Sequence, residues 1–328
     1  MKHNRLLLVI FFVLSSLLAF YGVWIFSQNL NEEELWTFAV ICDTRGGSEY
    51  SNTGVNDIVL KAMAKDIVEN DCDLVLIPRD LINGYSKDNN LSTEKQFENW
   101  KTAMSPVYNA RIKVYTVRGN HESGGSIGPA FKDAYFQAFS ADNPDNGPKG
   151  EKDLTYSFIH KNALFIGIDE YADHHTHKVN QEWVDSQLKN NSQQHIFFFG
   201  HEPAFRINHK DCLEVYPENW DEFWNSIGDA GGQVYFCGHD HFYNRARIQD
   251  DSGNEIYQVI SGSGGAPFAE WDPSEGKENS RFKLEYHNQV DYGYSLVTVD
   301  EDKVNIEWKA WNGSSDPIWV TKDSFQLE

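Results

Sequence analysis

The chain has 328 residues and a formal net charge of −21, with hydrophobic residues making up 40% of the sequence and aromatic residues 14%. This apolar content is enough for a substantial core. An acidic surface repels the phosphates of DNA and RNA, so the charge argues against a nucleic acid polymer as partner.

The N-terminus carries an apolar run at residues 6–26, preceded by Lys2 and Arg5 and followed by acidic residues at 32–34. A helix needs about 20 residues to cross a bilayer, and basic flanks tend to stay on the cytoplasmic side. We expect residues 1–30 to form an uncleaved signal anchor that spans the membrane through 6–26, with an exported body. A cleaved signal of a secreted or periplasmic protein is the alternative.

From residue 36 onward, short apolar runs alternate with helical patterns. Strands are predicted at 37–41, 74–77, 112–117, 156–159, 163–168, 195–199 and 233–236. Apolar residues recur at helical spacing at 55–69 (Ile58 among them), 93–104, 129–139, around 184–188 and around 223–227. Later strands are predicted at 255–260, 293–299 and 304–310. The pattern indicates an α/β region followed by a β-rich region, in one domain at 35–328.

The four cysteines show neither zinc-binding spacing nor a C-x-x-C pair. Two of them, Cys42 and Cys237, lie at the ends of strands that are expected to converge. A disulfide between them is geometrically open, and two small buried thiols in a core sheet are the alternative.

Residues with metal-binding side chains follow five of the predicted strands. In an open α/β sheet, ligands bind beyond the carboxyl ends of the strands. One Asp after a strand is usually a turn or cap residue, so only the joint pattern predicts a metal site. Carboxylate, amide and imidazole ligands suit manganese, iron or zinc, and two such ions can share a carboxylate and a hydroxide. The candidates are Asp43, Asp80, Asn120, His201, His239 and His241.

Two motifs, Gly119-Asn120-His121-Glu122 and Gly238-His239-Asp240-His241, make the pattern specific. Together with Asp43, Asp80 and His201 they resemble the signature of the calcineurin-like metallophosphoesterases, which include the purple acid phosphatases, over residues 36–245. The resemblance implies a four-layer α-β-β-α sandwich of two mixed sheets. It also implies a phosphatase or phosphodiesterase with a dinuclear metal centre and a bridging hydroxide that attacks phosphorus in line.

The resemblance assigns a role to each candidate. Asp80 would bridge the two ions; one site would be completed by Asn120, His201 and His239, and the other by Asp43 and His241. His121 would serve as general acid or phosphate-binding group, with Glu122 orienting its imidazole. The substrate would be a phosphorylated small molecule or an exported phosphoester.

Three positions depart from the family pattern. Arg45 replaces a common His, and a guanidinium does not ligate metal, so we predict either a clamp on substrate phosphate or a surface salt bridge. Asn83 stands where purple acid phosphatases have a Tyr ligand, and we predict it to be a weak, neutral ligand. Arg79 replaces a Gly before the bridging Asp, which predicts backbone strain and a side chain that either points outward or weakens metal binding. The alternative to an enzyme is a membrane-tethered module in which Arg79 and Arg45 have made the site non-catalytic and the domain binds phosphate or a partner.

Overall fold

The structure is a computed structural model that describes residues 35–84, 91–123, 129–173, 175–271, 281–314 and 317–327. Residues Trp36–Glu328 form one compact unit. The predicted signal anchor at 1–30, with its apolar run at 6–26, lies outside the described residues. Within the described ranges, no helix combines the length and the apolar character needed to span a bilayer.

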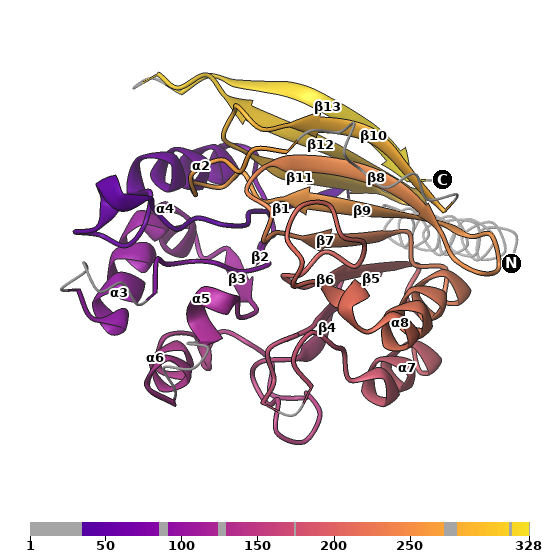
Figure 1. Cartoon of the computed structure of the whole chain (residues 1–328). Coiled ribbons are helices and arrows are strands. Elements are labelled where there is room, and N and C mark those ends of the chain that lie inside the picture. Colours follow the sequence, from indigo (N-terminus) through magenta and orange to yellow (C-terminus); the bar gives the residue numbers. More distant parts are fainter. Residues whose placement is uncertain are drawn as a thin grey trace, which may run out of the picture. The chain divides into compact units, whose positions relative to one another are not determined.

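Two mixed sheets form the centre of this unit (Figure 1). The first sheet has the strand order β13-β12-β11-β1-β2-β3. Its strands are β1 (Trp36–Val40), β2 (Leu74–Ile77), β3 (Lys113–Thr116), β11 (Gly293–Asp300), β12 (Lys303–Trp311) and β13 (Trp319–Leu327). The β1, β2 and β3 strands run parallel, whereas β11 pairs antiparallel with β1. The first strand, β1, is therefore paired with β2 on one side and with the much later strand β11 on the other.

The second sheet has the order β10-β8-β9-β7-β6-β5-β4. Its strands are β4 (Tyr156–His160), β5 (Ala163–Gly167), β6 (His195–Phe199), β7 (Val234–Cys237), β8 (Tyr243–Gln249), β9 (Glu255–Ser261) and β10 (Phe282–Asn288). The β5, β6, β7 and β9 strands run parallel. The carboxyl ends of these parallel strands therefore share one edge of the sheet.

Helices cover the outer face of each sheet. The described helices are α2 (Asp57–Glu69), α3 (Thr93–Ala103), α4 (Ser105–Asn109), α5 (Asn120–Ser123), α6 (Pro129–Phe139), α7 (Gln181–Lys189) and α8 (Pro217–Asp229). Figure 1 shows α2, α3 and α4 on one side of the sheets and α7 and α8 on the other. The predicted helices thus occur, although Ile58, which was placed on the buried face of 55–69, is 59% exposed.

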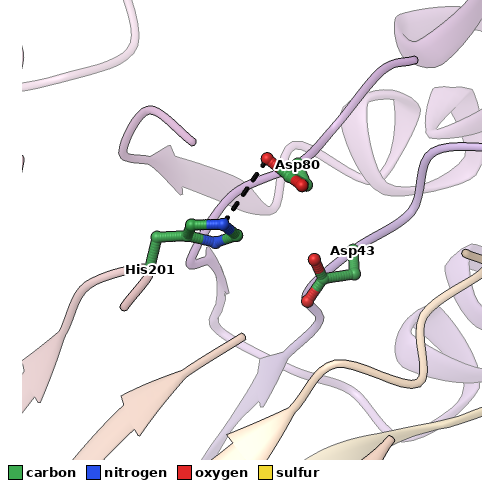
Figure 2. Close-up of side chains that lie close together, drawn as sticks. All are labelled: Asp43, Asp80 and His201. Carbon is green, nitrogen blue, oxygen red and sulfur yellow. Dashed lines mark ion pairs between the residues drawn. The ribbon is translucent and has the colours of Figure 1, made fainter. Parts of the chain in front are cut away.

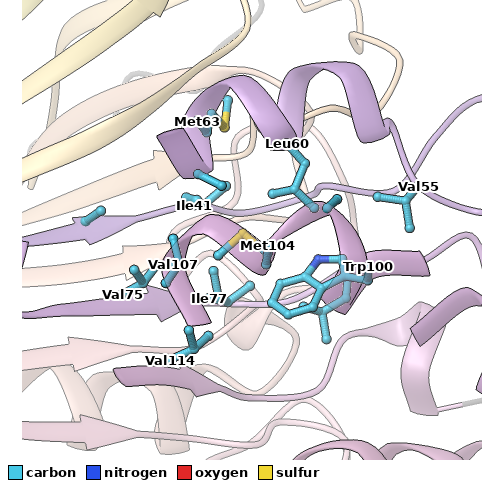
Figure 3. Close-up of a cluster of buried hydrophobic side chains, with 14 of the residues drawn as sticks. Ile41, Val55, Leu60, Met63, Val75, Ile77, Trp100, Met104, Val107 and Val114 are labelled. Atoms are coloured by element: carbon cyan, nitrogen blue, oxygen red, sulfur yellow. The ribbon is translucent and has the colours of Figure 1, made fainter. Parts of the chain in front are cut away.

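The unit has four layers, namely helices, the first sheet, the second sheet and helices, and a hydrophobic cluster fills each of the three interfaces between them. Alternate residues of a strand face opposite sides, so Phe38 of β1 packs between the two sheets while Ala39 packs against the helices. The helix-side cluster of the first sheet joins β1, β2, β3 and β11 to α2, α3, α4 and α6 (Figure 3). A third cluster joins the second sheet to α7 and α8. The expected α/β class with two mixed sheets is therefore confirmed.

The cysteines are all free and buried. The Cys42 thiol donates a hydrogen bond to the Cys237 carbonyl oxygen at 3.2 Å. Of the two alternatives, the structure has the pair of buried thiols.

We expect Phe38→Ala to lower the free energy of unfolding by about 3–5 kcal/mol, because the ring is fully buried and its removal leaves a cavity between the sheets. The Phe38 ring makes edge contacts with Phe197 and Phe165, at centroid distances of 5.0 and 5.2 Å. Chemical denaturation of the full chain measures the change. The exposed Ile58→Ala is the matched control and should change stability by no more than about 0.5 kcal/mol. Equal losses in the two variants would contradict this assignment of the core.

Candidate metal centre

The turns that follow the strands have unusual backbone conformations. Asp43, Arg79, Asp80 and His239 have φ values of 56°, 90°, 48° and 70°, in the left-handed region that non-glycine residues rarely adopt. Such strain costs on the order of 1–3 kcal/mol per residue and persists where surrounding contacts enforce it. Here the Asp43 amide donates to the Arg79 carbonyl at 2.9 Å, and the His239 amide donates to Asp43 Oδ2 at 3.0 Å. The turns of three strands are therefore locked to one another.

Two glycines of the predicted motifs allow this close approach. A Cβ atom on Gly119 would lie 2.0 Å from Asp80 Oδ1, and one on Gly238 would lie 2.4 Å from Asp43 Oδ2. Both contacts are shorter than any real Cβ contact. The glycines are therefore required because a carboxylate occupies the space of their missing side chains.

Asp43, Asp80 and His201 form the centre of the site (Figure 2). One potential ligand atom from each lies within 4.8 Å of the other two, and all three residues are buried. His201 Nε2 is 3.6 Å from Asp80 Oδ1. Three distant parts of the chain thus meet as the sequence predicted.

Asn120 lies between Asp80 and His201. In one orientation its amide oxygen is 3.0 Å from His201 Nε2, and in the other its amide nitrogen donates to Asp80 Oδ1 at 3.2 Å. The first orientation turns the oxygen toward the same space as the carboxylate and the imidazole, which suits a cation.

The two other predicted histidines flank this centre. The His239 ring lies 4.7 Å from the His201 ring between centroids, and its Nε2 is 3.2 Å from Asp211 Oδ1. His241 Nε2 is 3.8 Å from Asp43 Oδ1, while its Nδ1 lies 3.0 Å from the Pro267 carbonyl oxygen. With Nδ1 donating to that carbonyl, Nε2 keeps its lone pair toward Asp43.

Burial and like charge set the protonation of these groups. Burial and the neighbouring Asp80 raise the pKa of Asp43 well above its usual range. Burial acts to raise the pKa of Asp80 too, but its neighbours His121 and Arg45 hold it below its usual range. Burial lowers the pKa of His201, and lowers that of His241 to about 3, so both imidazoles are neutral and able to ligate.

The donor set fits a metal ion. Asp43 Oδ1 is buried and accepts no hydrogen bond, although it lies among other potential ligands. An unpaired buried carboxylate oxygen is costly unless a proton or a cation compensates it. Oxygen and imidazole donors that converge on one point are the ligands of manganese, iron and zinc.

Arg45 points into this centre instead of forming a surface salt bridge. Its Nη2 is 3.2 Å from His241 Nε2, its Nε is 3.8 Å from Asp80 Oδ2, and its Nη1 donates to Asn83 Oδ1 at 3.4 Å. The side chain is 16% exposed. The Asn83 amide oxygen, predicted as a weak ligand, therefore faces the guanidinium.

His121 lies at the rim, but Glu122 does not orient it. His121 Nδ1 is 2.8 Å from the Asn83 carbonyl oxygen, and Nε2 is 3.7 Å from Asp80 Oδ2. Glu122 is buried beneath and accepts hydrogen bonds from the amides of Gly119 and Ile82. Burial and Asp80 raise the pKa of Glu122 to about 8. The expected orienting contact thus comes from a backbone carbonyl, and Glu122 holds the turn.

Arg79 is fully buried and does not point outward, so that alternative is wrong. Its Nη2 forms ion pairs with Asp169 Oδ1 at 2.9 Å and Glu170 Oε2 at 2.8 Å, and Arg118 pairs with Asp169 at 2.6 Å. Glu170 Oε2 also accepts from the His201 amide at 3.2 Å. The guanidinium therefore supports the His201 turn from behind.

The two carboxylates that pair with Arg79 and Arg118 were not predicted from the sequence. Asp169 and Glu170 follow the predicted strand 163–168 directly, which is the placement that singled out Asp43 and Asp80. The same rule applied to this strand would have found them.

We expect Arg79→Met to lower the free energy of unfolding by about 3–5 kcal/mol, because two buried carboxylates lose a cation. Arg79→Gly should lose less, because glycine relieves the strain at φ 90°. Denaturant midpoints of the full chain measure both effects. A native-like midpoint in both variants would show that the carboxylates do not depend on this guanidinium.

Comparison with known proteins identifies the fold and the family. The calcineurin-like phosphoesterase family matches residues 37–243, which is more than half of the chain. The chain belongs to the calcineurin-like phosphoesterase family. No curated protein sequence gives a match.

Solved structures of the family share the fold at low identity. A purple acid phosphatase from yellow lupin (Lupinus luteus) superposes with a TM-score of 0.67 at 17% identity, over 90% of this chain and 54% of that one. PhoD gives 0.64 at 16% identity, over 90% and 70%. A dimetal phosphatase from Danio rerio gives 0.57 at 14% identity, over 88% and 99%. This chain thus spans about half the length of the lupin enzyme.

Proposed function

We propose that the chain hydrolyses phosphate monoesters or diesters at a metal centre held by Asp80, Asn120, His201 and His239, with Asp43 and His241 beside it. The supporting observation is the convergence of Asp43, Asp80 and His201, with an unpaired buried oxygen on Asp43. Manganese, iron or zinc, when bound, would polarise a phosphoryl oxygen and lower the pKa of a water ligand.

His121 is proposed to protonate the departing alkoxide. The Asn83 carbonyl oxygen accepts from Nδ1, which leaves Nε2 to carry the transferable proton on the side of Asp80. The side chain is 26% exposed, so a substrate reaches it from solvent. A positioned general acid of this kind contributes roughly 10²–10⁴-fold to the rate.

Arg45 is proposed to bind a non-bridging oxygen of the substrate phosphate. It is partly exposed and directed toward the ligands, and a guanidinium matches the geometry of phosphate oxygens. Because the chain carries a net charge of −21, an anionic substrate needs such local positive charge. We propose a phosphorylated small molecule, or an exported phosphoester, as substrate.

We expect His121→Asn to lower kcat by roughly 10²–10⁴-fold with unchanged metal content, because the variant loses only the proton donor. Turnover of an alkyl phosphate ester by the full chain in detergent, with manganese added, measures the effect, because an alkoxide needs a proton to depart. His195→Asn, at the start of β6, is the control and should keep full activity. An unchanged kcat in His121→Asn would contradict the proposal that His121 is the general acid.

We also expect Asp80→Asn to lose both bound metal and turnover, because the proposed central ligand loses its charge. Elemental analysis of the purified chain measures the metal. If the unsubstituted chain itself had neither metal nor turnover, the result would instead favour the non-catalytic membrane-tethered module.

We propose that residues 6–26 anchor the chain in a membrane, with residues 35–328 exported. The length of the apolar run and its flanking charges support this. Protease added to intact cells should digest the body of the chain. Full protection of the body in intact cells, with digestion after lysis, would contradict an exported domain.

A further inference from the structure

The Arg45 guanidinium contacts the residues that a second metal ion would need. In the two-ion arrangement implied by the resemblance, that ion would be held by Asp43, Asp80 and His241, with Asn83 as a weak ligand. Arg45 reaches His241 Nε2 at 3.2 Å, Asn83 Oδ1 at 3.4 Å and Asp80 Oδ2 at 3.8 Å. These contacts come from three different nitrogens, so the guanidinium lies among the ligands.

The backbone of Arg45 is fixed in place. Its amide donates to the Asp80 carbonyl oxygen at 3.1 Å, and the residue forms an antiparallel bridge with Val55. The side chain therefore starts from a rigid point directly beside the bridging carboxylate. Its Nε is buried, makes no hydrogen bond and lies 3.8 Å from Asp80 Oδ2.

Charge disfavours a second ion beside this guanidinium. A guanidinium carries a positive charge and has no lone pair with which it could bind a metal ion. A metal ion at His241 and Asp43 would lie next to a permanent cation in a partly buried site, where repulsion is strong. The two carboxylates, Asp43 and Asp80, need positive charge, and one metal ion together with one guanidinium supplies it.

We infer that this chain holds a single metal ion, at Asp80, Asn120, His201 and His239, and that the Arg45 guanidinium takes the place of the second. This inference rests on the proposed metal-dependent hydrolysis. It differs from the two-ion centre that the resemblance implies.

A guanidinium in place of a second metal ion changes how the site binds substrate. A guanidinium donates hydrogen bonds to phosphate oxygens but cannot coordinate a hydroxide, so a hydroxide that bridges two ions has no place here.

The test counts metal ions in the full chain and in three variants. Arg45→His supplies the missing imidazole, Arg45→Gln removes the charge at similar length, and Arg111→His makes the same change at an exposed turn. Manganese per chain is measured by elemental analysis after equilibrium dialysis, and electron paramagnetic resonance separates isolated ions from coupled pairs. Circular dichroism checks that each variant is folded.

We expect one uncoupled manganese ion in the native chain and in Arg111→His. Arg45→His should take up a second, coupled ion, and Arg45→Gln should bind a second ion at least roughly tenfold more tightly than the native chain does. Two coupled ions in the native chain, with hydrolysis intact, would overturn the inference and leave the proposed function standing. A single ion in both Arg45 variants would overturn it as well. Absence of metal and of hydrolysis from the native chain would overturn the proposed function itself.

Discussion

Two buried carboxylates that face each other, Asp43 and Asp80, are the constraint on which the rest of the site depends. Like charges in a water-poor site cannot both ionise unless positive charge stands between or beside them. The opposed pKa shifts of the pair express this conflict, with Asp43 raised and Asp80 lowered. The neutral imidazoles of His201 and His241 add ligand atoms without adding charge, and the Arg45 guanidinium adds a positive charge. The strained turns hold this arrangement together because their amides donate to each other's oxygen atoms.

A second layer of charge supports the first. Behind the centre, Arg79 and Arg118 compensate Asp169 and Glu170, and Glu170 in turn accepts from the amide of His201. The Arg79 guanidinium is therefore matched by carboxylates and does not approach the metal ligands uncompensated. A residue that breaks the family pattern in sequence is accommodated here by a partner network further along the chain. That network costs desolvation, which makes its members sensitive to single substitutions.

Much of the site followed from one rule, that side chains after parallel strands meet at one edge. It placed Asp43, Asp80 and His201 correctly because strand order and direction suffice to fix those positions. The rule says nothing of where a long side chain turns. The directions of Arg79 and Arg45, and the backbone partner of His121, depend on contacts far apart in sequence, and no local pattern encodes them. The prediction that Ile58 is buried was wrong for a related reason. The apolar residues of 55–69 cover a wider arc of the helix than the arc that packs against the sheet, so Ile58 is exposed.

The strand that precedes Asp43, β1, pairs on one side with a strand that lies far along the chain. β11 pairs along the whole of β1, from Trp36 with Val299 to Val40 with Ser295. Until those residues leave the ribosome, β1 is an open edge with unpaired amides and carbonyls, a template for wrong pairing. A nascent chain that lacks β11 therefore presents an exposed strand edge next to the turn of Asp43. Shielding of this edge is therefore needed until β11 has been synthesised.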